Sequence, residues 1–332
     1  MDNLTHTAIG LFLSRAGLGR WSPRATAVVL VAANLPDIDV ISSAGGSLNY
    51  LTYHRHLTHS LLLMPVVAIA AVLLVRLAGR KPVRWLGAFA AALVAVASHL
   101  ALDWTNVYGI RLLLPFSDKW LRSDITGVID LWIWAALAVG IAGPFLARLV
   151  GSEISSGAAR ERHHGRGFAW FTLAVVLLYD CGRSVLHARA VASLESRMYE
   201  GAVPVRVAAM PDAVNPFRWR GIVETPGAYV VQEVNLGLDL GAARGTVFHK
   251  PEGEPAIEAA RRTQTFQKFL AFSQYPLWRV SPYGDGENGR LVEVFDMRFG
   301  TPLAPGFMAR AVLDGRLEVK ETSFQFGAVR PK

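Results

Sequence analysis

Four long apolar stretches, all before residue 190, constrain the fold of this chain more than any other feature of its sequence. Each is close to the ~20 apolar residues that a helix needs to cross a lipid bilayer. They are residues 60–78, 85–103, 127–150 and 168–187. Two shorter apolar runs, residues 4–18 and 24–35, are interpreted as short helices packed inside or beside a bundle. Residues 1–193 are therefore predicted to form an α-helical membrane bundle.

The composition supports this prediction and excludes two other classes. Hydrophobic residues make up 52% of the chain and charged residues only 18%, which is too apolar for an ordinary soluble enzyme. The single cysteine, Cys181, excludes an internal disulfide and a zinc site built from cysteines.

The sequence changes character after about residue 194. Short stretches of alternating apolar and polar residues, several of them separated by turn signals, are typical of strands. They are residues 203–209, 218–223, 228–234, 277–281, 290–299, 307–313 and 316–323. One interval, residues 256–272, has helical spacing. Residues 194–332 are predicted to form a soluble α+β, β-rich domain.

Basic residues predict how the bundle is oriented. The turn at residues 79–84, the loop at 160–166 and the connection at 15–24 are all basic, and basic loops stay on the cytoplasmic side of a membrane. This places the polar clusters of the bundle and the C-terminal domain on the periplasmic side of a bacterial-type inner membrane. The net charge of +8 is explained in the same way, and a nucleic-acid partner is not expected.

Histidines and aspartates gather at the predicted periplasmic ends of the apolar runs. Residues 54–60 read His-Arg-His-Leu-Thr-His-Ser, just before an apolar run. His99 and Asp103 are four apart, so they share one face of a helix. Asp37 and Asp39 are two apart, so they share one face of an extended segment. Together with His6 and Asp130, these residues predict a metal site.

The residue types favour a divalent cation and an anionic substrate. Imidazole and carboxylate groups are ligands of Zn²⁺, with Mn²⁺ as the alternative. Thr58 is predicted to cap a helix whose first turn contains His59. A helix N-terminus attracts anions, and the guanidinium of Arg55 suits a phosphate group. Asp118, Lys119, Arg122 and Asp124 lie in a loop that is expected to line the entrance.

Each feature also has a purely structural interpretation. His6 can be a polar group at the membrane interface, and His99 with Asp103 can form a hydrogen bond that locks two helices. Asp37 and Asp39 can cap helices, and the residues from His54 to His59 can contact lipid headgroups. Asp180 and Arg183 are three apart and can simply pair.

The same motifs resemble the YdjM-type family of membrane-bound, metal-dependent hydrolases. The resemblance rests on His6, residues 34–39, His54-Arg55-x-x-Thr58-His59-Ser60 and Ser98-His99-x-x-x-Asp103, with Thr105, Gly109 and Pro115 continuing the pattern. It covers roughly residues 1–150. Such proteins are more distantly similar to zinc-dependent phospholipases C and zinc single-strand nucleases. The C-terminal domain resembles an extension found in longer members.

The resemblance implies a set of functional residues. Its metal ligands would be His6, Asp37, His54, His59, His99 and Asp103. Asp39 would be a further ligand or the base for a metal-bound water, and Arg55 would contact the substrate or support the ligands. Two positions depart from the family: Val40 replaces a histidine of some members, and His56 replaces a small residue.

The function expected from these features is hydrolysis of a phosphoester, such as a lipid headgroup, by water activated on one to three divalent ions. Membrane lipids and an anionic substrate are the expected partners. A non-catalytic membrane protein with a structural metal site and a domain that binds an envelope partner is the first alternative. A metal or ion transporter is the second, and it would place the ligands near the bilayer midplane.

Overall fold

The computed structural model of the protein describes residues 1–79, 82–154, 164–237, 245–284 and 289–327. Arg80, Lys81, Arg160, Arg162 and His163 of the predicted cytoplasmic turns lie outside these residues. The chain divides into two compact units. Unit 1 consists of Met1–Asp39, Arg55–His187 and Pro211–Pro216, and unit 2 of Val40–His54, Ala188–Met210 and Phe217–Lys332.

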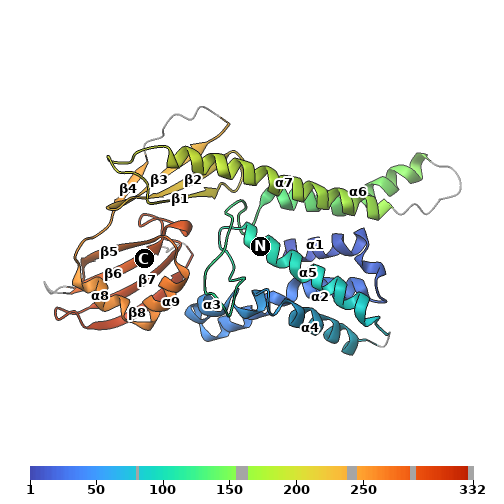
Figure 1. The fold of residues 1–332 in the computed structure, drawn as a ribbon, viewed down its shortest axis with the longest axis horizontal. Helices are drawn as coiled ribbons and strands as arrows, with labels where there is room; N and C mark the ends of the chain where they lie inside the picture. Colours follow the sequence, from blue (N-terminus) through green and yellow to red (C-terminus); the bar gives the residue numbers. More distant parts are fainter. Residues whose placement is uncertain (80–81, 155–163, 238–244, 285–288, 328–332) are drawn as a thin grey trace. The chain divides into compact units, whose positions relative to one another are not determined.

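Unit 1 is built from the apolar stretches, which form helices (Figure 1). These are α1 (Asn3–Ala16), α2 (Ala25–Asn34), α4 (Met64–Leu77), α5 (Trp85–Thr105), α6 (Leu131–Ile154) and most of α7 (His164–Glu195). Two 3-10 helices, η2 (Leu35–Gly45) and η3 (Leu57–His59), follow α2 and precede α4. A further 3-10 turn, η1 (Leu18–Arg20), joins α1 to α2.

Among the described residues, three helical segments are long and apolar enough to cross a membrane: Ala25–Gly45, Trp85–Thr105 and Gly165–Glu195. A fourth crossing is possible if Ser47–His59 and Met64–Leu77, which meet at an angle of 88°, form one broken span. The apolar part of α6, Leu131–Ala147, is shorter. The predicted fold class, apolar helices followed by a β-rich region, is confirmed.

Small residues allow the helices of unit 1 to pack closely. Helix α2 packs against α1, α4 and α5, and a Cβ atom on Gly10 of α1 would lie only 2.9 Å from the Cβ of Ala33. Buried alanines and valines of α2, α4 and α5 form one apolar core. Phe12, Ile133 and Val176 belong to a second core that joins α1, α6 and α7. The close packing holds the periplasmic ends predicted for α1, α2 and α5 near one another.

Unit 2 contains two four-stranded antiparallel sheets. The first has β1 (Arg206–Pro211), β2 (Arg218–Glu224), β3 (Ala228–Asn235) and β4 (Thr246–His249), in that order. The second has β5 (Pro276–Pro282), β6 (Arg290–Asp296), β7 (Phe307–Leu313) and β8 (Val319–Phe326). A 3-10 turn, η4 (Met297–Phe299), follows β6. All seven predicted strands overlap an observed one, whereas the short β4 was missed.

The helical interval predicted at residues 256–272 is two helices, α8 (Pro255–Arg261) and α9 (Gln264–Phe272). The side chain of Thr263 accepts a hydrogen bond from the backbone N–H of Phe266 and so caps a new helix. Three phenylalanines of α9, Phe266, Phe269 and Phe272, are fully buried. They anchor this helix in unit 2.

A short helix near the N-terminus belongs to unit 2. Helix α3 (Ser47–Tyr53) packs against α9 and β8. The Ser47 hydroxyl donates to the Phe324 carbonyl at 3.4 Å. The chain therefore leaves unit 1 after Asp39 and returns at Arg55, where the Arg55 N–H donates to the Asp39 carboxylate at 2.7 Å. This hydrogen bond ties together the two ends of the excursion.

Candidate metal centre

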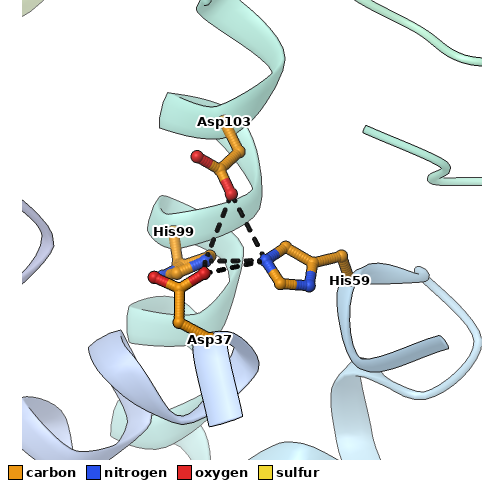
Figure 2. A group of neighbouring side chains, drawn as sticks. All are labelled: Asp37, His59, His99 and Asp103. Atoms are coloured by element: carbon orange, nitrogen blue, oxygen red, sulfur yellow. Dashed lines mark hydrogen bonds and ion pairs between the residues drawn. The ribbon is translucent and has the colours of Figure 1, made fainter. Parts of the chain in front are cut away.

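Four side chains from three separate segments converge inside unit 1 (Figure 2). Asp37 comes from η2, His59 from η3, and His99 and Asp103 from successive turns of α5. His59, His99 and Asp103 have no exposed surface, and Asp37 is 8% exposed. The site is therefore closed except on the side of Asp37.

Five of the six distances among the four facing atoms are close to those of a tetrahedral ligand set. His59 Nε2 lies 3.2 Å from His99 Nε2, 3.3 Å from Asp37 Oδ1 and 3.3 Å from Asp103 Oδ2. His99 Nε2 lies 3.3 Å from Asp103 Oδ2 and 3.7 Å from Asp37 Oδ1. Ligand atoms about 2.0–2.1 Å from one zinc ion at tetrahedral angles lie about 3.3–3.4 Å apart. These residues can thus hold a metal ion without large movements.

The His99 ring is oriented by the backbone. Its Nδ1 lies 2.7 Å from the carbonyl oxygen of Ala33, so Nδ1 carries the proton and donates. The lone pair on Nε2 then points at the other three ligand atoms. Fixing the tautomer in this way is what metal-binding histidines require.

The His59 ring is oriented by Asp39. The Asp39 carboxylate lies 3.2 Å from His59 Nδ1 and accepts a hydrogen bond from the Thr58 hydroxyl at 3.2 Å. Asp39 thus contacts the Nδ1 side of the His59 ring, whereas the converging atoms lie on its Nε2 side. A carboxylate in this position fixes the ring and raises its basicity toward a metal.

Two predictions about local backbone structure, at Asp37–Asp39 and at Thr58, were wrong. Asp37 and Asp39 do not lie on an extended segment but on the 3-10 helix η2, where residues two apart point in different directions. This is why Asp37 faces His99 while Asp39 faces the back of His59. Thr58 does not cap a helix that starts at His59, because α4 begins only at Met64. The Thr58 hydroxyl instead donates a hydrogen bond to the Asp39 carboxylate.

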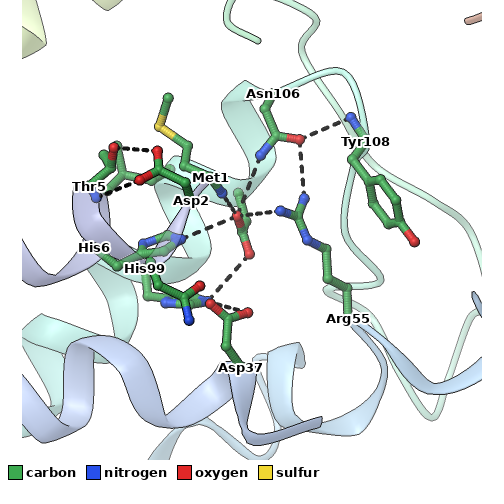
Figure 3. A network of polar contacts seen from close by, with 12 residues as sticks. Met1, Asp2, Thr5, His6, Asp37, Arg55, His99, Asn106 and Tyr108 are labelled. Atoms are coloured by element: carbon green, nitrogen blue, oxygen red, sulfur yellow. Dashed lines mark hydrogen bonds and ion pairs between the residues drawn. The ribbon is translucent and has the colours of Figure 1, made fainter. Parts of the chain in front are cut away.

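Asp103 is held by Arg55 and Asn106, two residues whose contact with each other is drawn in Figure 3. Arg55 Nη2 lies 2.8 Å from Asp103 Oδ1, and Arg55 Nη1 donates to Asn106 Oδ1 at 3.1 Å and to the Gly109 carbonyl at 3.0 Å. Asn106 Nδ2 donates to Asp103 Oδ1 at 3.4 Å. The Met1 ammonium pairs with the same oxygen. Asp103 Oδ2 is left to face the two histidines.

His6 lies beside the four ligands. Its ring stacks on His99 with a centroid distance of 3.7 Å, and its Nε2 is 3.5 Å from Asp103 Oδ1. His6 is 1% exposed. Neither of its ring nitrogens has a hydrogen-bond partner among the described residues. Buried polar atoms are rarely left unpaired, so an additional cation next to His6 would satisfy them.

Unpaired carboxylate oxygens also indicate a cation. Asp37 Oδ2 and Asp103 Oδ2 are buried and accept no hydrogen bond within the part of the chain that the structure describes. Burying carboxylates costs several kcal/mol each unless a cation compensates them. The donor set of two imidazoles and two carboxylates fits a divalent ion, although no metal identity follows from the geometry alone.

Two other predicted residues are not among these four. His54 ends α3, and its ring stacks on Tyr50 at 4.5 Å. With Asp37 and Asp39 it forms a second group of possible ligands, whose ligand atoms lie within 4.8 Å of one another. Asp130 accepts hydrogen bonds from the backbone N–H groups of Trp132 and Ile133 at 3.0 and 3.2 Å, so it caps α6. Tyr179 also donates to Asp130. Asp130 therefore takes the structural role and is not among the converging ligands.

Comparisons with known proteins agree with the motifs. The sequence model of the YdjM inner membrane protein family matches residues 1–190. The chain belongs to this family. The model of the YfhP C-terminal alpha/beta plait domain matches residues 255–327. The chain is also similar to the uncharacterized protein YfhP of Bacillus subtilis (strain 168), with 25% identity over 312 residues, 89% of this chain and 86% of the relative. No solved structure matches significantly.

The family match places the candidate metal centre in the YdjM region. Asp37, His59, His99 and Asp103 all lie within the matched residues 1–190. The family is one of inner membrane proteins, in agreement with the three candidate spans. The protein is thus a membrane protein with a buried His/Asp cluster that can bind a metal ion.

Proposed function

We propose that this YdjM-family protein is a membrane-bound, divalent-metal-dependent hydrolase that acts on a phosphoester. The observation that carries the proposal is that ligand atoms of His59, His99, Asp37 and Asp103 converge within 4.8 Å of one another. The other ring nitrogen of each histidine contacts an oxygen that orients the ring. A divalent ion held there would polarise the substrate oxygen and lower the pKa of water to about 7.

Zn²⁺ is the proposed ion, with Mn²⁺ as the alternative. Two imidazole nitrogens and two carboxylate oxygens form a ligand set that zinc accepts readily. The unpaired ring of His6, next to Asp103 Oδ1, supports a second ion in the same centre. This agrees with the expected number of one to three ions.

The chain's own residues would position the ligands and the substrate. Asp39 keeps the Nε2 of His59 directed at the centre. Arg55 holds one oxygen of Asp103 and leaves the other to the centre. Asp37 is the only one of the four with exposed surface, so the substrate is proposed to approach from its side. A role of Asp39 as a base stays a prediction.

A periplasmic location of the site is proposed from the helix ends. Trp85 and Trp170 lie near the starts of α5 and α7, whereas Trp104 and Trp132 lie at the end of α5 and the start of α6. All four are at least 44% exposed. Tryptophans favour the two membrane–water interfaces, and the basic turns lie beside the first pair. Asp103 is next to Trp104, on the side away from those turns.

Reporter fusions test this orientation. A fusion after Pro82 should give fluorescent green fluorescent protein and inactive alkaline phosphatase, because this turn is proposed to be cytoplasmic. A fusion after Phe326 should give the reverse result, since α7 is proposed to run outward. A fusion after Ser196, just past α7, serves as the control and should match that after Phe326. The same reporter pattern at Pro82 and Phe326 would refute the orientation.

Hydrolysis is tested on the purified full chain in detergent. Zn²⁺- or Mn²⁺-loaded protein should cleave chromogenic phosphoesters or phospholipids, and a chelator should abolish the activity. His99→Ala and Asp37→Asn are expected to lower the rate about 100-fold or more, the loss typical when a charge-stabilising group is removed. His249→Ala, which lies on β4 of unit 2, should retain the wild-type rate. Activity that survives both ligand substitutions would exclude this centre as its source.

The burial of the cluster supports one alternative. Structural zinc sites are closed by four protein ligands, whereas catalytic sites keep a position open. Three of the four residues here have no exposed surface. A non-catalytic protein with a structural ion is therefore the second candidate. Metal content without hydrolysis of any phosphoester in the same assay would favour it.

A further inference from the structure

Arg111 is a largely buried arginine that forms no ion pair with any described residue. It is 8% exposed, and its guanidinium lies over the Trp120 ring, 4.6 Å from the centroid. Its buried Nε has no hydrogen-bond partner, and no hydrogen bond or ion pair joins its guanidinium to another described residue. Since a buried charge is costly unless it is paired, the missing partner calls for an explanation.

The segment that carries Arg111 is fixed to the metal centre on both sides. Two residues before it, the Gly109 carbonyl accepts from Arg55, which holds Asp103. One residue after it, the Leu112 carbonyl accepts from the N–H of Leu61 at 3.0 Å, two residues beyond His59. The backbone of Arg111 is thus held between segments that supply two ligands.

Glycine is required in this segment. Gly109 has a φ of +84°, and a Cβ there would lie 3.0 Å from the Leu121 carbonyl oxygen. Next to it, Ile110 and Leu121 exchange backbone hydrogen bonds of 2.9 Å. These contacts hold Trp120 beneath Arg111. The guanidinium is therefore preorganised on an aromatic surface, which leaves its planar fork of N–H donors available.

Two other arginines of this region, Arg55 and Arg122, are already engaged. Arg55 uses both terminal nitrogens on Asp103, Asn106 and Gly109, and Arg122 pairs with Asp124. Burial lowers the pKa of Arg111, an effect that the exposed carboxylate of Asp118 and the buried Tyr108 only partly oppose. A bound anion would remove the cost of this unpaired charge.

We propose that the Arg111 guanidinium binds a phosphate oxyanion next to the metal centre and so forms the anion-binding arm of the site. The ligand class is a phosphate group carried by a soluble ester or by a lipid headgroup. The link to hydrolysis rests on the proposed function, whereas phosphate binding by Arg111 does not require it. Planar donors in a fork match two oxygens of a phosphate group.

Binding is tested on the full chain in detergent after metal removal, with inorganic phosphate as the probe and ³¹P NMR line broadening as the readout. Arg111→Gln is expected to weaken phosphate binding at least tenfold. The matched control is Lys119→Gln, which removes the same charge from an exposed position of the same loop and should change the affinity less than twofold. Micelles doped with phosphatidic acid form a second arm, and they show whether the phosphate can be lipid-borne.

Arg111→Lys keeps the charge and the stem but loses the fork, so it should bind phosphate several-fold more weakly even if Arg111→Gln fails to fold. Arg111-dependent binding of either probe supports the proposal. It is overturned if the wild type binds neither probe, if Arg111→Lys binds as tightly as the wild type, or if Lys119→Gln loses as much as Arg111→Gln. Metal content measured on the purified chains before metal removal separates the two proposals. If the chain never retains metal but binds phosphate through Arg111, the proposed hydrolase function is contradicted and the proposed phosphate site is still supported.

Discussion

His99→Ala is expected to purify with less than about a tenth of the metal that the wild-type chain retains. Losing even a residue that only orients a ligand typically costs 10–100-fold in metal affinity, and His99 is itself a proposed ligand. The substitution removes an Nε2 that lies 3.2–3.7 Å from three other donor atoms. Elemental analysis of protein dialysed against metal-free buffer measures the ratio of metal to chain.

His59→Ala should give the same loss, since its ring faces the same centre. The control is His249→Ala, which removes a histidine of unit 2 that lies outside the centre. It should keep the wild-type metal content. Wild-type metal content in both His99→Ala and His59→Ala would show that the cluster is not the binding site.

Arg55→Ala is expected to lower the free energy of unfolding of the metal-free protein by about 3–5 kcal/mol, the typical cost of removing one partner of a buried ion pair. Arg55 is 3% exposed and Asp103 is fully buried, so water cannot replace the lost contact. The substitution also leaves Asn106 Oδ1 and the Gly109 carbonyl without this donor. Denaturant unfolding in mixed micelles, with chelator present, measures the change.

The matched control is Arg84→Ala, because Arg84 is exposed at the start of α5 and its side chain makes no ion pair with a described residue. Its unfolding free energy should stay within about 0.5 kcal/mol of the wild type. Added Zn²⁺ should restore part of the stability lost in Arg55→Ala, since a cation then compensates Asp103. A loss no greater than that of Arg84→Ala would contradict the structural role of Arg55.

The helical periodicity of the sequence was sufficient to predict the pairing of His99 with Asp103. Their Nε2 and Oδ2 atoms lie 3.3 Å apart across one turn of α5, as the spacing of four requires. Asp37 and His59 have no such local relation to α5. They were placed near it only by the charge rule for the loops, which gave the same side of the membrane but no distance.

Local geometry was harder to predict. The run from Leu35 to Gly45 contains a proline and two aspartates, which favoured an extended segment, yet it forms a 3-10 helix. The change separates Asp37 from Asp39 and gives them different contacts. Helix α3 has only seven residues, so its packing against α9 in unit 2 could be seen only in the structure.

Neither Asn106, which contacts Asp103, nor Arg111, the proposed phosphate-binding residue, was predicted. Asn106 follows Asp103 by three positions, a spacing that could have indicated its contact with the carboxylate. Arg111 lies in a loop with several charged residues, and nothing local distinguishes it from Lys119 or Arg122. Its burial against Trp120 depends on the pairing of Ile110 with Leu121, which is a tertiary contact.

X-ray absorption at the metal edge of the purified wild-type chain tests the central claim most directly. The account predicts a nitrogen and oxygen shell at about 2.0–2.1 Å with the scattering pattern of two imidazole rings. A chain that holds no divalent metal, or a metal shell without imidazole scattering, would contradict the claim that His59, His99, Asp37 and Asp103 bind one ion.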